Sequence, residues 1–125
     1  MAVIAAAVAV AILTGLAVLQ VCVAAGAPWG RFVWGGRHRV LPRRLRIGSA
    51  VSVLLYAVFA AILLARAGVL PGCTSPVVVV ATWVLFGYFA LGILMNLASR
   101  SPAERWTMAP ACVVLAVLTA VVALS

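Results

Sequence analysis

The residues best suited to chemistry in this sequence are arginines, and most of them lie in one short segment. Residues 30–46 read GRFVWGGRHRVLPRRLR and contain six arginines, one histidine and no acidic residue. Guanidinium groups bind phosphate and carboxylate groups through paired N–H donors, so this segment predicts an anionic partner. The candidate residues for binding an anion or a lipid headgroup are Arg37, Arg39, Arg43, Arg44 and Arg46.

Groups that could donate or accept protons are scarce. The 125 residues include one acidic residue, Glu104, and one histidine, His38. General acid–base catalysis and metal binding both need several positioned titratable or ligating groups. We therefore expect no catalytic residue, no metal site and no cofactor. An enzyme that binds lipid or isoprenoid phosphates through its arginines is the least favoured alternative.

The elements that position the arginines are apolar. Hydrophobic residues make up 68% of the chain, charged residues 8%, and the mean hydropathy is +1.33. A helix needs about 20 apolar residues to cross the hydrocarbon core of a bilayer. Four stretches of that length occur, at residues 2–25, 47–65, 77–98 and 106–124. The sequence thus predicts an all-α integral membrane protein, a single domain over residues 1–125 built as an up-and-down bundle of four transmembrane helices.

The distribution of arginine predicts an orientation for this bundle. With four spans, loops 26–46 and 99–105 share one face, while loop 66–76 shares the other face with both termini. The first face carries eight arginines and the second only Arg66. Short loops rich in arginine stay in the cytoplasm, so we expect both termini outside the cell inner (plasma) membrane. Trp29, Trp34 and Trp106 fall at the arginine-rich boundary, as an interfacial aromatic belt requires.

Local signals predict where two helices begin. Ser101-Pro102-Ala103-Glu104 has the pattern of a capping box that opens the fourth helix. Pro42 suits the first position of the second helix, which places Arg43, Arg44 and Arg46 in its first turn. Cations are disfavoured there by the helix dipole, so an anion should offset them. Lipid phosphates are the abundant candidate, and the alternative is ordinary topology determination with nonspecific attraction to anionic headgroups.

Inside the four apolar stretches the polar groups are few and uncharged. Tyr56 and Tyr88 each lie about 16 Å along their helices, so they should meet near the membrane midplane, with Asn96 on the same helix as Tyr88. This polar cluster either joins helices by hydrogen bonds or lines a path for a polar solute. Cys73, in the outer loop, should lie apart from Cys22 and Cys112, and is either a free thiol or a link between subunits.

These observations favour a small polytopic membrane protein without a catalytic site of its own. Its function would be that of an accessory, scaffold or binding protein whose cytoplasmic face engages anionic lipid headgroups or an acidic partner. The alternative is an oligomeric channel or small-solute transporter with a polar path near Tyr56, Tyr88 and Asn96. Four helices fill their own interior, so such a path would require a homo-oligomer. We expect no nucleic-acid partner.

Overall fold

The structure, a computed structural model, describes all 125 residues and is entirely helical. The four long helices are α1 (Ala2–Ala24), α2 (Arg43–Arg66), α3 (Pro76–Leu97) and α4 (Pro102–Ala123). Two short 3-10 helices, η1 (Gly30–Phe32) and η2 (Trp34–Gly36), lie between α1 and α2. Each long helix is long and apolar enough to cross a membrane. The predicted all-helical class and the four helices of spanning length are confirmed.

Two helices begin earlier than their apolar stretches. α2 begins at Arg43, before the apolar stretch that starts at residue 47, and α4 begins at Pro102, before the stretch that starts at residue 106 but where the Ser101 capping pattern predicted. Backbone hydrogen bonding does not stop where the apolar residues stop, so both helices extend through charged residues. Arg43 and Arg44 do occupy the first turn of α2. The position predicted for Pro42 is wrong, because it is the N-cap residue with an extended ψ of 161°.

The capping box at the start of α4 forms only in part. The Ser101 hydroxyl accepts a hydrogen bond from the Glu104 backbone N–H at 3.4 Å, as a capping serine should. The Glu104 carboxylate does not complete the box, because the Ser101 backbone N–H donates to the Ser99 hydroxyl instead. Glu104 accepts a hydrogen bond from the Gly35 backbone N–H at 3.2 Å. The only acidic side chain thus joins α4 to the loop between α1 and α2.

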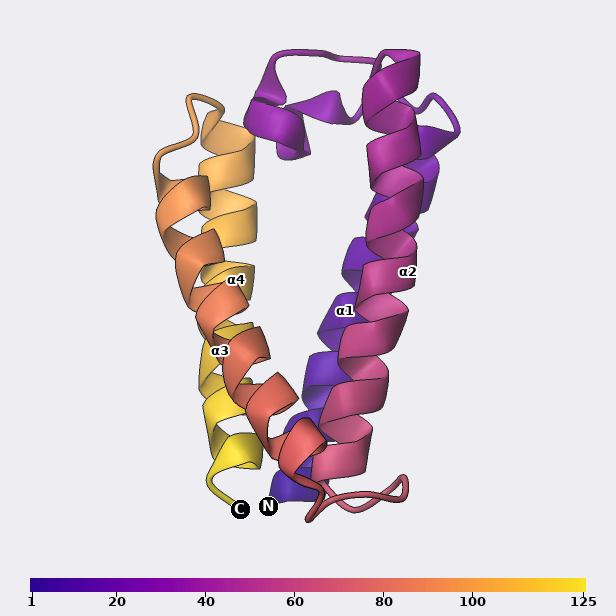
Figure 1. The fold of residues 1–125 in the computed structure, drawn as a ribbon. Coiled ribbons are helices and arrows are strands. Elements are labelled where there is room, and N and C mark those ends of the chain that lie inside the picture. The colour runs from indigo at the N-terminus through magenta and orange to yellow at the C-terminus, as the bar shows by residue number, and fades with distance from the viewer.

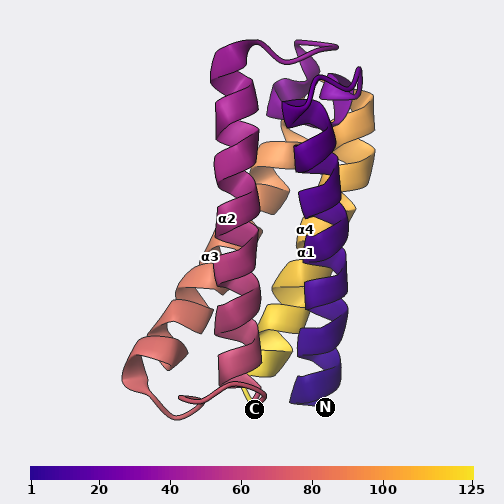
Figure 2. The same ribbon diagram turned by 90° about the vertical axis from the view of Figure 1, so that its right-hand side faces the viewer.

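The four helices form two antiparallel pairs that diverge. α1 packs along α2 and α3 packs along α4, with a further contact between α1 and α4. Figure 1 shows the two pairs close together where both termini and the loop of residues 67–75 lie, which we call the narrow end. They separate toward the loops of residues 25–42 and 98–101, the wide end. Figure 2 shows that α1 and α2 remain side by side along their lengths.

The larger of the two apolar clusters occupies the narrow half of the bundle. Small residues of α1 and α4, including Ala6, Ala9 and Ala116, are buried where these helices approach each other. Close approach of helices through small residues is the usual packing mode in membranes, where van der Waals contact drives association. Larger side chains fill the remaining interior: Leu13, Leu63, Leu85, Phe89 and Leu115.

Arg66 links two elements at the narrow end by hydrogen bonds. Its Nη1 donates to the Cys73 carbonyl at 3.1 Å, and its Nη2 donates to the carbonyls of Ala123 at 3.3 Å and Ser125 at 2.8 Å. The last carbonyls of a helix have no partner within the helix, and arginine side chains satisfy them well. This arginine therefore joins the turn after α2 to the end of α4.

Candidate functional site

The wide end carries a surface of exposed arginines. Arg37 and Arg39 follow η2, and Arg43 and Arg44 form the first turn of α2; all four are exposed. We call these four residues the basic surface. The guanidinium groups that do hydrogen-bond to the protein belong to other arginines, namely Arg46, Arg66 and Arg105. The side chains of the basic surface are therefore free to meet a partner.

Arg46 differs from the other four predicted anion-binding residues. It is half-buried, and its Nε donates to the Ala24 carbonyl at 2.8 Å. That carbonyl lies in the last turn of α1, so Arg46 ties the end of α1 to the start of α2. Its role is at least partly structural.

Glu104 does not neutralise the basic surface. Its side chain is only 7% exposed, and its carboxylate accepts its hydrogen bond from a backbone N–H rather than from an arginine. The sequence contains no other acidic side chain. The charge of the four exposed arginines is thus left for a partner outside the chain.

A short segment, residues 30–36, bridges the two helix pairs at the wide end, and we call it the lid. The Trp34 indole Nε1 donates to the Ser49 hydroxyl of α2 at 3.0 Å. On the other side, Gly35 donates to Glu104 and the Arg31 carbonyl accepts from the Ser101 hydroxyl. Trp34 was expected in an interfacial belt, but it has this specific docking contact as well as an exposed edge.

Glycines allow the lid to lie this close to its neighbours. The Trp34 ring lies over Gly48 of α2, where a Cβ atom would be 2.8 Å from the ring. A Cβ on Gly36 would collide with the Ser101 side chain, and a Cβ on Gly30 would collide with the His38 carbonyl. Glycine is the residue that permits such backbone approach. The tryptophan and glycine pattern of the lid is therefore explained by its docking.

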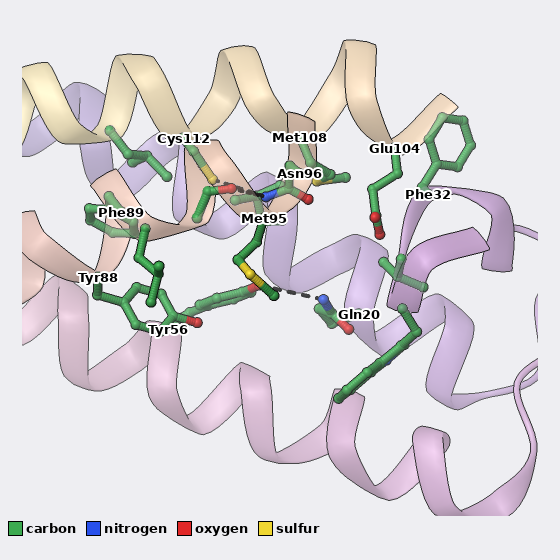
Figure 3. Close-up of a pocket in the computed structure, with 16 residues that line it drawn as sticks. Gln20, Phe32, Tyr56, Tyr88, Phe89, Met95, Asn96, Glu104, Met108 and Cys112 are labelled. Carbon is green, nitrogen blue, oxygen red and sulfur yellow. Dashed lines mark hydrogen bonds between the residues drawn. The ribbon is translucent and has the colours of Figure 1, made fainter. Parts of the chain in front are cut away.

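A cavity of about 380 Å³ lies beneath the lid, between the two helix pairs. Twelve of its 16 lining residues are hydrophobic. Tyr56 from α2 and both Tyr88 and Asn96 from α3 are among them, so the structure brings the predicted polar cluster into one cavity (Figure 3). Gln20 of α1 joins this cluster through a hydrogen bond from its Nε2 to the Tyr56 hydroxyl at 3.4 Å.

The two tyrosines do not bond to each other. The Phe59 ring packs against both, with centroids 6.2 Å from Tyr56 and 5.1 Å from Tyr88. Asn96 donates to the Gly92 carbonyl at 2.7 Å and contacts the Cys112 sulfur at 3.5 Å. Thr82 likewise bonds within its own helix. Few polar side chains in the helices therefore act as hydrogen-bonded links between them.

Sequence reasoning missed two parts of the cavity. Glu104 lines its wall, although the sequence assigned this residue only a capping role and placed it outside the fourth span. The lid residues Phe32, Val33 and Trp34 also line it. A signal for the lid was present in the Trp-Gly-Gly sequence. No local pattern could show that Glu104 faces the cavity, because the capping box already accounted for a glutamate at that position.

All three cysteines are free, and no group of three or more His, Cys, Asp or Glu residues is placed to hold a metal ion. Comparison of the chain with protein-family models, with curated proteins and with solved structures found no match.

Proposed function

We propose that this protein is a small multi-pass membrane protein that binds anionic lipid headgroups through the basic surface at its wide end. It does so as an accessory or scaffold protein, without a catalytic site of its own. The wide end lies at the cytoplasmic face of the plasma membrane and both termini lie outside, since arginine-rich loops are retained in the cytoplasm.

The observation that carries this proposal is that the four arginines of the basic surface have no partner within the protein. They are exposed, they make no hydrogen bond to the protein, and the one carboxylate of the chain is buried elsewhere. Near an anionic membrane surface each basic residue contributes about 1 kcal/mol of attraction. Guanidinium groups also bind phosphate through paired N–H donors, which favours a phosphate-bearing headgroup.

The start of α2 adds to this attraction. Pro42, at the N-cap, supplies no side-chain hydrogen bond to the first turn. The first N–H groups of a helix are then left for another acceptor, and phosphate is well suited to that position. The neighbouring Arg43 and Arg44 increase the positive potential at the same place.

The test is the lipid preference of the purified protein in nanodiscs that contain equal amounts of phosphatidylglycerol and phosphatidylcholine. Native mass spectrometry should find phosphatidylglycerol enriched among the retained lipids. Replacing Arg37, Arg39, Arg43 and Arg44 together by glutamine should reduce that enrichment at least about tenfold, given the contribution of each residue.

The matched control separates a defined site from general charge. Arg31 and Arg100 are also exposed arginines of the wide end, so the pair Arg31→Gln with Arg100→Gln removes as much charge as Arg43→Gln with Arg44→Gln. Replacing Arg43 and Arg44 should reduce the enrichment of phosphatidylglycerol more than replacing Arg31 and Arg100. A wild-type protein that retains both lipids equally contradicts the proposal.

A second candidate function is passage of a solute through an oligomer. The observation that favours it is the placement of Tyr56, Tyr88 and Asn96 around one cavity. Two residues of the cavity wall, Phe89 and Leu115, also belong to the packed core of the narrow half. A continuous path across the membrane therefore needs residues from a second copy of the chain. This candidate function predicts solute flux into liposomes that carry the protein.

A further inference from the structure

The cavity beneath the lid has the size and composition of a ligand site. Its volume of about 380 Å³ falls in the range of small-molecule pockets, which are mostly apolar with a few placed polar groups. Its walls include Phe32, Trp34, Tyr56, Tyr88 and Phe89, five of the ten aromatic residues of the chain. None of the nine arginines lines it. The cavity is thus chemically distinct from the basic surface.

The cavity is accessible from the side of the bundle. Three lining residues of α3 are exposed on the outer surface, Tyr88 at 50%, Leu91 at 59% and Met95 at 67%. These residues belong to the second half of α3, and Figure 1 shows that α2 and α3 diverge toward that end of α3. With the helices in a bilayer, this side faces hydrocarbon. A ligand that enters here must therefore first dissolve in the membrane.

Two of the polar groups of the cavity offer an acceptor that has no donor in the protein. Figure 3 shows Glu104 extending from α4 and Gln20 from α1 into the space between the helix pairs. One Glu104 oxygen accepts the Gly35 N–H, which leaves the other without a bond. The Gln20 Oε1 atom is buried and has no hydrogen-bond partner. A buried acceptor without a donor is costly, so a ligand that brings N–H donors is favoured.

The carboxylate of Glu104 restricts the class of ligand further. Glu104 is almost completely buried and no arginine pairs with it among the hydrogen bonds of the structure. A carboxylate in a mostly apolar site is stabilised by a cation, and the faces of aromatic rings also attract cations. The same carboxylate repels the phosphate of a lipid headgroup. An anionic lipid is therefore a poor occupant of this cavity.

The lid holds the carboxylate in place. Gly35 is fixed by its neighbour Trp34, whose indole is bonded to Ser49 and packed on Gly48. Trp34 itself adopts a φ of +53°, a conformation that is unfavourable for a side chain of this size. The bond from Gly35 then directs Glu104 toward the cavity rather than toward the solvent at the wide end.

We propose that the cavity between the helix pairs is a binding site for a membrane-soluble amine, whose protonated nitrogen contacts Glu104 and Gln20 and whose apolar body lies against the aromatic wall. The site is independent of the headgroup function of the basic surface, because the two share no residue. Either can fail without the other.

The experiment uses the full chain in phosphatidylcholine nanodiscs and three photoreactive probes of equal chain length. Each probe carries a diazirine on an alkyl chain, and the head is a primary ammonium, an alcohol or a carboxylate. After illumination, mass spectrometry locates the adducts. The ammonium probe should label the partly buried cavity residues Met108 and Cys112 at least about tenfold more than the other two, as expected for one favourable charge pair in a buried site.

Two variants test the role of Glu104. Glu104→Gln keeps the shape of the side chain and the acceptor for Gly35, so it should lower labelling by the ammonium probe at least about tenfold and leave labelling by the alcohol probe unchanged. Glu104→Asp keeps the charge and should restore part of the labelling. Thermal unfolding of each variant verifies that the helices remain assembled.

Several outcomes would overturn the proposal. One is equal labelling of the cavity by all three probes, and another is unchanged ammonium labelling in folded Glu104→Gln. A third is competition by a phospholipid: phosphatidylglycerol added to the nanodiscs occupies the cavity and abolishes its labelling by the ammonium probe. Labelling of the basic surface by the carboxylate probe bears only on the headgroup proposal, so the failures of the two are distinguishable.

Discussion

Two neighbouring glycines let the lid pass between α2 and α4. Gly35 and Gly36 both have positive φ, at 75° and 71°, a region that other residues adopt only at a cost. They differ in their surroundings. A Cβ on Gly36 would collide with the Ser101 side chain, whereas a Cβ on Gly35 would meet nothing within 4 Å. An alanine at position 35 therefore adds backbone strain alone, whereas an alanine at position 36 adds the same strain together with a steric clash.

We expect Gly36→Ala to destabilise the protein more than Gly35→Ala. Both substitutions add about 1–2 kcal/mol of backbone strain. Gly36→Ala adds an overpacking penalty of about 1–3 kcal/mol against Ser101. The measurement is the midpoint of thermal unfolding in detergent, followed by circular dichroism. Equal midpoints for the two variants would show that the lid is not packed against α4.

Arginine residues have different roles according to the element that carries them. Those at the start of α2 are exposed and unpaired, whereas Arg66 at its end donates hydrogen bonds to the turn before α3 and to the end of α4. The difference arises because the helix pairs converge at one end and diverge at the other. At the narrow end Arg66 of α2 reaches the carbonyls at the end of α4, which belongs to the other helix pair, whereas Arg46 at the wide end reaches only α1 of its own pair.

We expect Arg66→Gln to destabilise the bundle by about 1.5–3 kcal/mol, because hydrogen bonds from a charged donor are lost at partly buried carbonyls. The matched control is Arg100→Gln, an exposed arginine of the wide end, which should change stability by less than about 0.5 kcal/mol. Unfolding of both variants in the same detergent compares them. A loss for Arg100→Gln as large as that for Arg66→Gln would contradict this role.

At the scale of the whole molecule, charge and shape are arranged along the same axis. The wide end carries eight of the nine arginines and the lid, and the narrow end carries Arg66, Cys73 and the two chain ends. If the wide end is cytoplasmic, a ligand reaches the cavity from the inner half of the bilayer. The headgroup proposal therefore depends on the orientation, whereas the amine site depends on it only for the leaflet from which a ligand enters.

We predict that a membrane-impermeant maleimide labels Cys73 in intact cells. Cys73 lies in the loop at the narrow end and is a free thiol, whereas Cys22 and Cys112 lie in helices α1 and α4. The variant Cys22→Ala with Cys112→Ala restricts labelling to Cys73, and the variant Cys73→Ala should remain unlabelled. Labelling of Cys73 only after the cells are opened would place the narrow end in the cytoplasm.

The sequence by itself determined the all-helical class of this protein, its four helices of membrane-spanning length and the segregation of its charges. These follow from composition and from the length of uninterrupted apolar runs, which are local properties of the chain. Ser101 as a cap and Arg43 in a first helical turn were also predictable, because capping depends on residues close together in the sequence. The boundaries were less exact where helices continued past their apolar residues.

Only the tertiary structure decided where the cavity lies and what faces it. The divergence of the helix pairs results from unequal packing, with small residues of α1 and α4 in the narrow half and the lid between the pairs in the wide half. Contacts such as that of Gly35 with Glu104 join residues far apart in the chain. No local pattern encodes them, because a hydrogen bond of this kind depends on how whole helices are placed in space.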